Sequence, residues 1–254
     1  MKLSYFILFL GIFSSSLGFA GPRSLGLSGA LRGGITLNES LNSNPASFAF
    51  TDKYSIEAYV DVKPGMRSWN ASVVDTKTSF YGAALGYSRK DFDVEMPQNV
   101  IQGALAKRWG AFSLGVGSDY TFNDVLNHVN LKAGGLVQVH PRLHVGLVGE
   151  DLLSNSKILG AGVQLNIYDI LLLSSDVSKN LSKKSFDVQT GAEIHHEKTG
   201  LSFRGGGHLN TSSSFQSYSL GAGWALYKLG FFYGFEKSLK KSESRHALSM
   251  RVFF

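Results

Sequence analysis

Histidines are the first candidates for chemistry in this sequence, because a metal site or a hydrolase would need them. His195, His196 and Glu197 are adjacent, whereas the helical zinc motif places its two histidines four residues apart. A hydrolase would need a histidine base beside a nucleophile, and the other candidate bases have no partner at a defined spacing: His128, His144, His208 and His246. The sequence therefore predicts no enzyme, no metal site and no cofactor.

A glycine run at Arg204–Gly207 is the second candidate, for phosphate binding. It lacks the Lys-Ser/Thr ending that a phosphate-binding loop requires. A glycine-rich strand that allows close packing or a bend is the favoured interpretation. His195–Glu197 in turn is predicted to be a polar turn between strands, so both candidates lead back to β-structure.

Apolar and polar side chains alternate from Tyr54 to the C-terminus, in short segments separated by turns. Alternation is typical of strands with one apolar and one polar face. Residues 51–254 hold about fourteen such segments, and membrane-spanning strands need roughly 9–11 residues each. We therefore expect an all-β fold, a closed antiparallel transmembrane β-barrel. Its last strand carries Leu248, Met250 and Val252 and ends at Phe254, which resembles the signal read by the barrel-insertion machinery.

Residues 1–20 have the layout of a signal peptide, with Lys2, an apolar run at 5–13, and small residues at Gly18 and Ala20. No later run approaches the roughly 18 apolar residues of a helical span. The chain contains 29 Gly and no Cys, and its net charge is a modest +6. These features predict an exported outer-membrane protein without disulfides and without a nucleic-acid partner.

The predicted connections differ in length at the two ends of the barrel, and aromatic residues gather near strand ends. Barrels of this class have short periplasmic turns, longer surface loops and aromatic girdles. Both termini are therefore expected at the periplasmic end. Basic residues in the predicted surface loops could contact the phosphates of lipopolysaccharide, although solvated loops explain them equally well: Lys183, Lys184, Lys237, Lys240, Lys241 and Arg245.

Strand parity assigns a set of charged residues to the barrel lumen. Charges of both signs in a narrow lumen are expected to pair with one another. The same face carries apolar residues such as Leu136, Val148 and Phe232, and a mixed lumen suits an amphipathic solute. The charged lumen-facing residues are predicted to be Glu57, Asp61, Lys132, Glu150, Asp176, Asp187, Glu193, Arg204 and Arg251.

Residues 21–50 do not alternate; they are rich in small residues and could fold into the barrel mouth as a hatch. This segment resembles the N-terminus of the FadL/PorV-like outer-membrane barrels, which combine a Gly-x-Arg opening, a small-residue stretch and an Asn-Pro-Ala element. The matching residues are Gly21, Arg23, Leu25, Gly26, Gly29, Ala30, Asn44, Pro45, Ala46 and Ser47. The chain differs from the fatty-acid transporters in lacking their long surface loops.

The resemblance implies fourteen strands, an N-terminal hatch, and passage or binding of hydrophobic or amphipathic small molecules at the outer membrane. It also leaves open a PorV-like scaffold or accessory barrel of a secretion or surface-assembly system, which transports nothing. The residues expected to gate the route are Arg23, Gly26, Gly29, Asn44, Pro45 and Ala46. Expected partners are outer-membrane lipid, lipopolysaccharide and a hydrophobic ligand.

Overall fold

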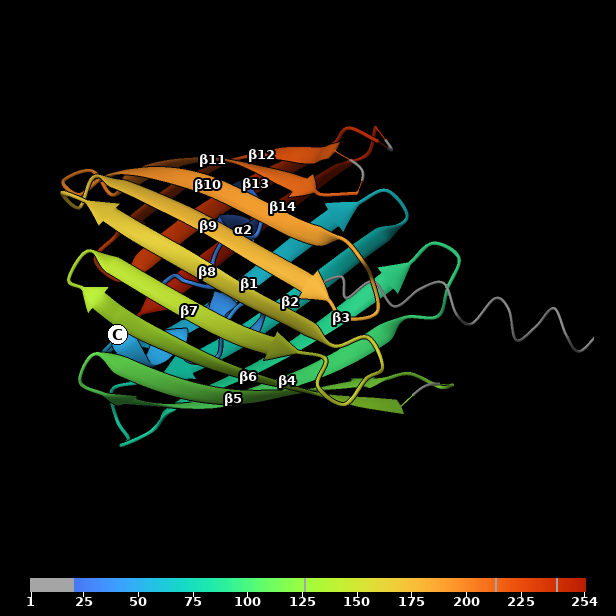
Figure 1. Cartoon of the computed structure of the whole chain (residues 1–254), viewed down its shortest axis with the longest axis horizontal. Coiled ribbons are helices and arrows are strands. Elements are labelled where there is room, and N and C mark those ends of the chain that lie inside the picture. Colours follow the sequence, from blue (N-terminus) through green and yellow to red (C-terminus); the bar gives the residue numbers. More distant parts are fainter. Residues whose placement is uncertain (1–20, 126, 213, 241) are drawn as a thin grey trace, which may run out of the picture.

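The computed structural model describes residues 21–125, 127–212, 214–240 and 242–254, so the predicted signal peptide lies outside the described residues. Fourteen strands form one closed antiparallel barrel (Figure 1). The sequence prediction of an all-β barrel with this strand number is confirmed. The strands are β1 Tyr54–Lys63, β2 Met66–Asp75, β3 Gly82–Phe92, β4 Gln98–Trp109, β5 Phe112–Phe122, β6 Asn127–His140, β7 Leu143–Glu150, β8 Ile158–Ile167, β9 Leu171–Asn180, β10 Phe186–His196, β11 Leu201–Asn210, β12 Ser214–Leu226, β13 Leu229–Ser238 and β14 Ser244–Phe253.

Each strand pairs with its sequence neighbours, and β1 closes the barrel against β14. At this seam Ile56 pairs with Val252 and Glu57 with Arg251. Closure removes the free strand edges that an open sheet would present. No helix in the described part of the chain is long and apolar enough to cross a membrane.

The outer face of the barrel is apolar, because the alternating pattern turns every second side chain outward. Leu85, Leu147 and Leu248 lie near the middles of their strands and are 57%, 63% and 60% exposed. Exposed leucines in such numbers are unfavourable in water but match the apolar band of a membrane barrel. The outer wall is therefore built to face lipid.

Leu248 provides a test of this orientation. Replacing Leu248 with Arg should destabilise the barrel by about 2–4 kcal/mol, because a cation near the bilayer midplane loses its hydration. Urea unfolding of the protein in phospholipid vesicles measures the difference. Leu248→Ala is the control, and equal stability of the Arg and Ala variants would place this face outside the membrane.

Most of the connections sort by length, as the sequence predicts, although 64–65 is a two-residue turn at the end opposite the C-terminus. Those at the C-terminal end include the two-residue turns 110–111, 141–142 and 227–228, whereas the opposite end carries 93–97, 151–157 and 181–185. One connection differs from the prediction, since β3 begins only at Gly82. The Asp75 carboxylate accepts backbone N–H bonds from Lys77 and Thr78, both at 3.0 Å, and so stabilises a turn in place of an earlier strand start.

Arg245 is a second difference, because it was expected in a surface loop. It lies in β14, where strand parity turns its side chain inward, and its guanidinium pairs with the buried carboxylate of Asp61. Lys237 also lies in a strand, β13, and its Nζ donates to the carbonyl of Ser242 at 2.7 Å. Lys183 and Lys184 do lie in a surface connection.

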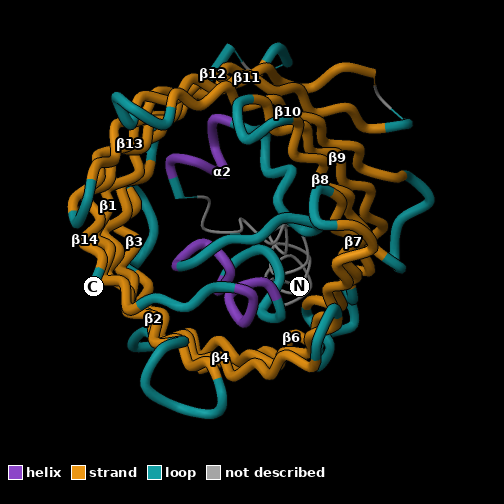
Figure 2. Tube along the Cα trace, turned by 90° about the vertical axis from the view of Figure 1, so that its left-hand side faces the viewer, coloured by secondary structure: helices purple, strands orange, loops and turns teal. Residues whose placement is uncertain are grey.

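The segment 21–50 lies inside the barrel (Figure 2). It contains one short helix, α2 Pro22–Gly26, and two 3-10 turns, η1 Asn38–Leu41 and η2 Ser47–Phe50. In the view down the barrel, α2 lies near β12 and β13, while the other two turns lie on the β2–β6 side of the lumen. We call residues 21–50 the hatch.

Candidate functional site

The hatch fills the lumen at the level where it crosses the barrel. None of its residues from 21 to 50 is exposed, and Leu27, Leu31 and Phe48 are completely buried. A small void between η1 and strands β1–β4 measures about 10 Å³, which is about the space of a single water molecule. The contacts of the hatch with the wall are therefore the candidate gating site.

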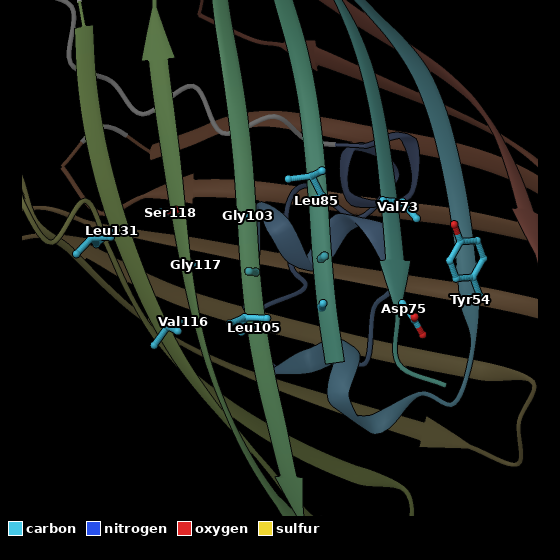
Figure 3. A pocket seen from close by; sticks show the side chains of 13 residues that line it. Tyr54, Val73, Asp75, Leu85, Gly103, Leu105, Val116, Gly117, Ser118 and Leu131 are labelled. Atoms are coloured by element: carbon cyan, nitrogen blue, oxygen red, sulfur yellow. The ribbon is translucent and has the colours of Figure 1, made fainter. Parts of the chain in front are cut away.

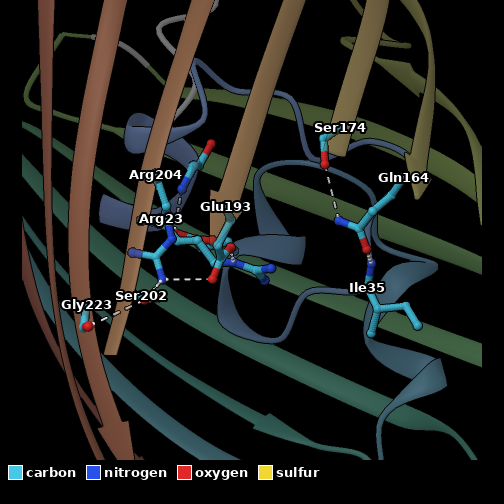
Figure 4. A network of polar contacts seen from close by, with 10 residues as sticks. Arg23, Ile35, Gln164, Ser174, Glu193, Ser202, Arg204 and Gly223 are labelled. Atoms are coloured by element: carbon cyan, nitrogen blue, oxygen red, sulfur yellow. Dashed lines mark hydrogen bonds and ion pairs between the residues drawn. The ribbon is translucent and has the colours of Figure 1, made fainter. Parts of the chain in front are cut away.

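A charged cluster ties the start of the hatch to the wall. Arg23 Nε donates to Glu193 Oε2 at 2.9 Å, and Arg204 Nη2 donates to Glu193 Oε1 at 3.1 Å (Figure 4). Ser202 Oγ accepts a further bond from Arg204 Nη2 at 2.7 Å. One carboxylate on β10 thus bridges an arginine of the hatch and an arginine of β11. We call Arg23, Glu193 and Arg204 the first latch.

A second cluster holds the middle of the hatch. The backbone N–H of Arg32 donates to Asp176 Oδ2 at 2.8 Å, and its Nη2 donates to Glu150 Oε1 at 2.9 Å. Its Nη1 donates to Gln189 Oε1 at 3.0 Å. Arg32 therefore links strands β7, β9 and β10 through one side chain and its own backbone. We call Arg32, Glu150 and Asp176 the second latch.

Within the hatch, Glu39 joins η1 to the start of α2. Its Oε1 accepts the backbone N–H groups of Arg23 at 3.0 Å and Ser24 at 3.1 Å. Burial raises the pKa of the Glu39 carboxyl, and the neighbouring Glu57 carboxylate raises it further. A further contact to the wall comes from Ile35, whose N–H donates to Gln164 Oε1 at 3.3 Å (Figure 4).

The Asn-Pro-Ala element is folded on itself and bound to β5 and β6. Asn44 Oδ1 accepts the N–H of Ala46 at 3.0 Å, and its Nδ2 donates to the carbonyls of Arg32 at 2.8 Å and Gly135 at 3.2 Å. Ser113 Oγ donates to the carbonyl of Ala46 at 2.9 Å. The side-chain amide therefore joins two parts of the hatch to each other and to the wall, while Pro45 is buried beside Gly115.

Glycines in the wall let the hatch backbone approach closely. A Cβ at Gly146 would lie 2.0 Å from the carbonyl oxygen of Arg32, and one at Gly162 would lie 2.5 Å from the nitrogen of Gly33. Any larger residue would displace the hatch there. Gly26 and Gly29, both predicted to take part in gating, lie against Gly221 and Gln189, and Gly29 has a φ of +86°, which favours glycine.

The remaining charged residues predicted to face the lumen form ion pairs. All four of these pairs join two wall strands, and Lys132 also donates to the hatch carbonyl of Leu41 at 2.5 Å. The pairs are Glu57–Arg251 at 2.8 Å, Asp119–Lys132 at 2.9 Å, Asp187–His208 at 3.0 Å, and Asp61–Arg245.

The apolar lumen residues are packed side chains. Leu136 and Val148 are 0% and 4% exposed. Phe232 lies between two guanidinium groups, 5.3 Å from that of Arg204 and 5.0 Å from that of Arg251. A separate apolar cluster joins the hatch to β2–β4 and consists of Leu37, Leu41, Phe48, Val74, Ala84, Ala104 and Ala106.

The histidine-rich segment has no metal-site geometry. His196 Nδ1 lies 2.8 Å from Thr199 Oγ1 at the turn after β10. No group of three or more metal-binding side chains occurs among the described residues. The run Arg204–Gly207 lies within β11, so it is part of a strand and not a loop that leads into a helix.

Arg32 was not among the predicted site residues, although the sequence contains a signal for it. Among the nine charged residues predicted to face the lumen, six are acids and three are bases. Buried charges need partners, so the three excess acids require further cations. Arg23, Arg32 and Arg245 supply them. Two of these three arginines belong to the hatch and the third to β14, so the excess of lumenal acids is a signal for cations in residues 21–50.

Solved structures of known proteins identify the fold. No protein-family model matches the sequence, and no curated protein matches it. Among solved structures, a deletion mutant of the monoaromatic hydrocarbon channel TodX aligns with a TM-score of 0.72 at 9% identity, over 94% of this chain and 99% of that one. The monoaromatic hydrocarbon channel CymD gives 0.68 at 12% identity, over 92% and 96%.

A FadL homologue of Pseudomonas aeruginosa aligns with a TM-score of 0.67 at 10% identity, over 92% of this chain and 98% of that one. The fold is that of a FadL-like outer-membrane barrel. The structural alignments extend over more than nine-tenths of the chain. The sequence resemblance covered only about thirty N-terminal residues, whereas the likeness of fold covers the barrel as well.

Proposed function

We propose that this FadL-like barrel resides in the outer membrane, binds hydrophobic or amphipathic small molecules, and lets them pass when the hatch moves. The observation that carries the proposal is the way the hatch is held. It forms no strand of the barrel and is bonded to the wall by side-chain contacts, chiefly the two latches. Such contacts can open and close while the barrel stays intact.

The solved structures with this fold support the substrate class. They include two monoaromatic hydrocarbon channels and the toluene transporter TbuX of Ralstonia pickettii. Because no hatch residue from 21 to 50 is exposed, a solute of that size has no open route past it in the closed state. Passage through the barrel therefore requires the hatch to shift.

A locked hatch provides the test. Ser28 Oγ in the hatch and Ser219 Oγ on β12 are 2.7 Å apart, close enough for a disulfide after small adjustments. The chain has no natural cysteine, so the pair Ser28→Cys and Ser219→Cys forms the one possible bridge. We expect oxidised cells to take up radiolabelled toluene and oleate no faster than cells without the protein, and dithiothreitol to restore uptake.

The matched control places a disulfide within the hatch alone. Thr36 Oγ1 and Ser47 Oγ are 2.9 Å apart, so Thr36→Cys with Ser47→Cys should crosslink without tying the hatch to the wall. Uptake should survive oxidation there. Equal uptake by the oxidised Ser28–Ser219 variant would show that the hatch does not gate the route.

A non-transporting scaffold, like PorV, is the second candidate, and the closed lumen is the observation in its favour. In that case the hatch would be a permanent core, and the natural protein would add nothing to uptake above the empty cells. Recovery of a stoichiometric protein partner together with absent uptake would favour the scaffold over the transporter.

A further inference from the structure

The outer wall contains an apolar groove that the gating site does not use. It measures about 680 Å³ and crosses strands β1–β6 on the lipid-facing side of the barrel (Figure 3). Its sides are formed by branched aliphatic residues, among them Leu85, Leu105, Val116 and Leu131. Ala84 and Ala104 also line the groove, and both belong to the apolar cluster that packs against the hatch on the inner side of the wall.

The groove is hollow because its floor consists of small residues, whereas the outward-facing positions around the floor carry leucine or valine. In one cross-strand row, Leu85 pairs with Gly103, Gly103 with Ser118, and Ser118 with Leu131. A Cβ added at Gly103 would meet no atom within 4 Å. The floor at Gly103 and Ser118 is therefore open to the membrane between walls of leucine.

The exposed apolar residues around the groove indicate which molecule covers it. Leu85, Leu105 and Val116 are 57%, 55% and 60% exposed and continue the apolar belt of the barrel. The belt faces the hydrocarbon of the bilayer, and an apolar hollow in it is filled by hydrocarbon of matching shape. A flexible acyl chain can enter such a groove from the lipid phase.

A cation and aromatic rings lie just beyond the residues that line the groove, toward the end of β4. Lys107 follows Leu105 by two residues in β4 and so lies on the same outward face. Its Nζ donates to the carbonyl of Phe80 at 2.9 Å and lies 5.5 Å from the ring centroid of Tyr81. This is the C-terminal end of the barrel, where short turns mark the periplasmic side. Lysine and aromatic rings at that depth contact lipid headgroups.

We propose that this groove is a binding site for one anionic phospholipid of the periplasmic leaflet. Its acyl chain lies over Gly103 and Ser118, and its phosphate lies at Lys107. Asp75 also lines the groove, on β2, where its carboxylate accepts hydrogen bonds from the turn at Lys77 and Thr78; the phosphate is therefore placed at Lys107 on β4, two strands away from this carboxylate. The proposal concerns the lipid-facing side of the wall and does not depend on transport through the lumen.

Filling the groove tests the acyl-chain part. The full-length protein is reconstituted in nanodiscs of equal amounts of phosphatidylethanolamine and phosphatidylglycerol, and retained lipid is counted by native mass spectrometry. We expect Gly103→Leu to lower the population with one bound phospholipid about tenfold, because each excluded methylene weakens chain binding. The matched control is Gly205→Leu, an outward glycine of β11 whose added Cβ would meet only atoms 3.9 Å away; it should retain the lipid.

Removing the cation tests the headgroup part. Lys107→Gln should abolish the preference for phosphatidylglycerol over phosphatidylethanolamine. Arg142→Gln should keep it, although Arg142 also lies over an aromatic ring at this end, 4.7 Å from the centroid of Tyr168. Equal lipid retention by the Gly103 and Gly205 variants would overturn the proposal. So would a barrel dimer that Gly103→Leu disrupts, because the groove would then be a protein interface.

Discussion

Replacing Glu193 with Ala should convert the closed barrel into one that conducts ions in planar bilayers. Glu193 is the one carboxylate shared by Arg23 of the hatch and Arg204 of β11, and the side chains of these arginines are only 18% and 1% exposed. Without it, the closed state holds two arginines that have no paired carboxylate, and only Arg204 keeps a side-chain hydrogen bond, to Ser202. Removing one member of a buried ion pair costs about 3–5 kcal/mol. Movement of the hatch lets water reach both arginines, so the open state is favoured.

A wall-to-wall ion pair gives the control for this effect. Asp61 is 1% exposed and pairs with Arg245, and both belong to barrel strands. Asp61→Ala should therefore lower stability in urea while leaving the pore closed. The Glu193 variant could instead conduct no ions and lose as much stability in urea as the Asp61 variant. That result would show that the first latch stabilises the fold but does not hold the hatch in place.

Replacing Gly146 with Val should dislodge the middle of the hatch and expose Arg32 to trypsin. The added Cβ would lie 2.0 Å from the Arg32 carbonyl oxygen and 2.9 Å from Asn44 Nδ2, so the hatch backbone has to move away from β7. Overpacking of this kind costs about 1–3 kcal/mol, and cleavage follows the population of the open form. We expect cleavage at Arg32 to accelerate about tenfold, as measured by mass spectrometry of the fragments.

Gly135→Val is the matched control on the adjacent strand. Gly135 faces outward, and the nearest atom to an added Cβ there is 3.6 Å away, on Leu114. The hatch should stay protected in this variant, because nothing in the lumen is displaced. If both valine variants are cleaved at the natural rate, the wall near β7 adapts to the added methyl groups and the close approach is not essential.

Much of the fold follows from the sequence because each membrane strand carries its own signal. Tyr54, Ile56 and Ala58 alternate with Ser55 and Glu57, and the structure places the two sets on opposite faces of β1. The error at Arg245 has a local cause, since a strand that begins among loop residues has no apolar neighbour to mark its first position. Its inward direction became evident only with the pairing of β14 to β1.

The candidate site is a different case, because it depends on contacts between residues far apart in the chain. Strand parity identified Glu193 and Arg204 as lumen-facing, and the resemblance singled out Arg23, but nothing in the sequence states that these three meet. Arg23 and Glu193 are separated by 170 residues. The approach of Gly33 to Gly162 is likewise invisible in sequence, since a glycine selected for close packing looks the same as one selected for a turn.

By itself the sequence determined the barrel, the membrane-facing belt and the separate nature of residues 21–50, because alternation and small-residue content are properties of single segments. Only the tertiary structure decided that the hatch fills the lumen, that two latches hold it, and that a groove crosses the outer wall at Gly103. These features arise when fourteen strands close into a ring, since closure alone sets which side chains meet across the lumen and which small residues line up on adjacent strands.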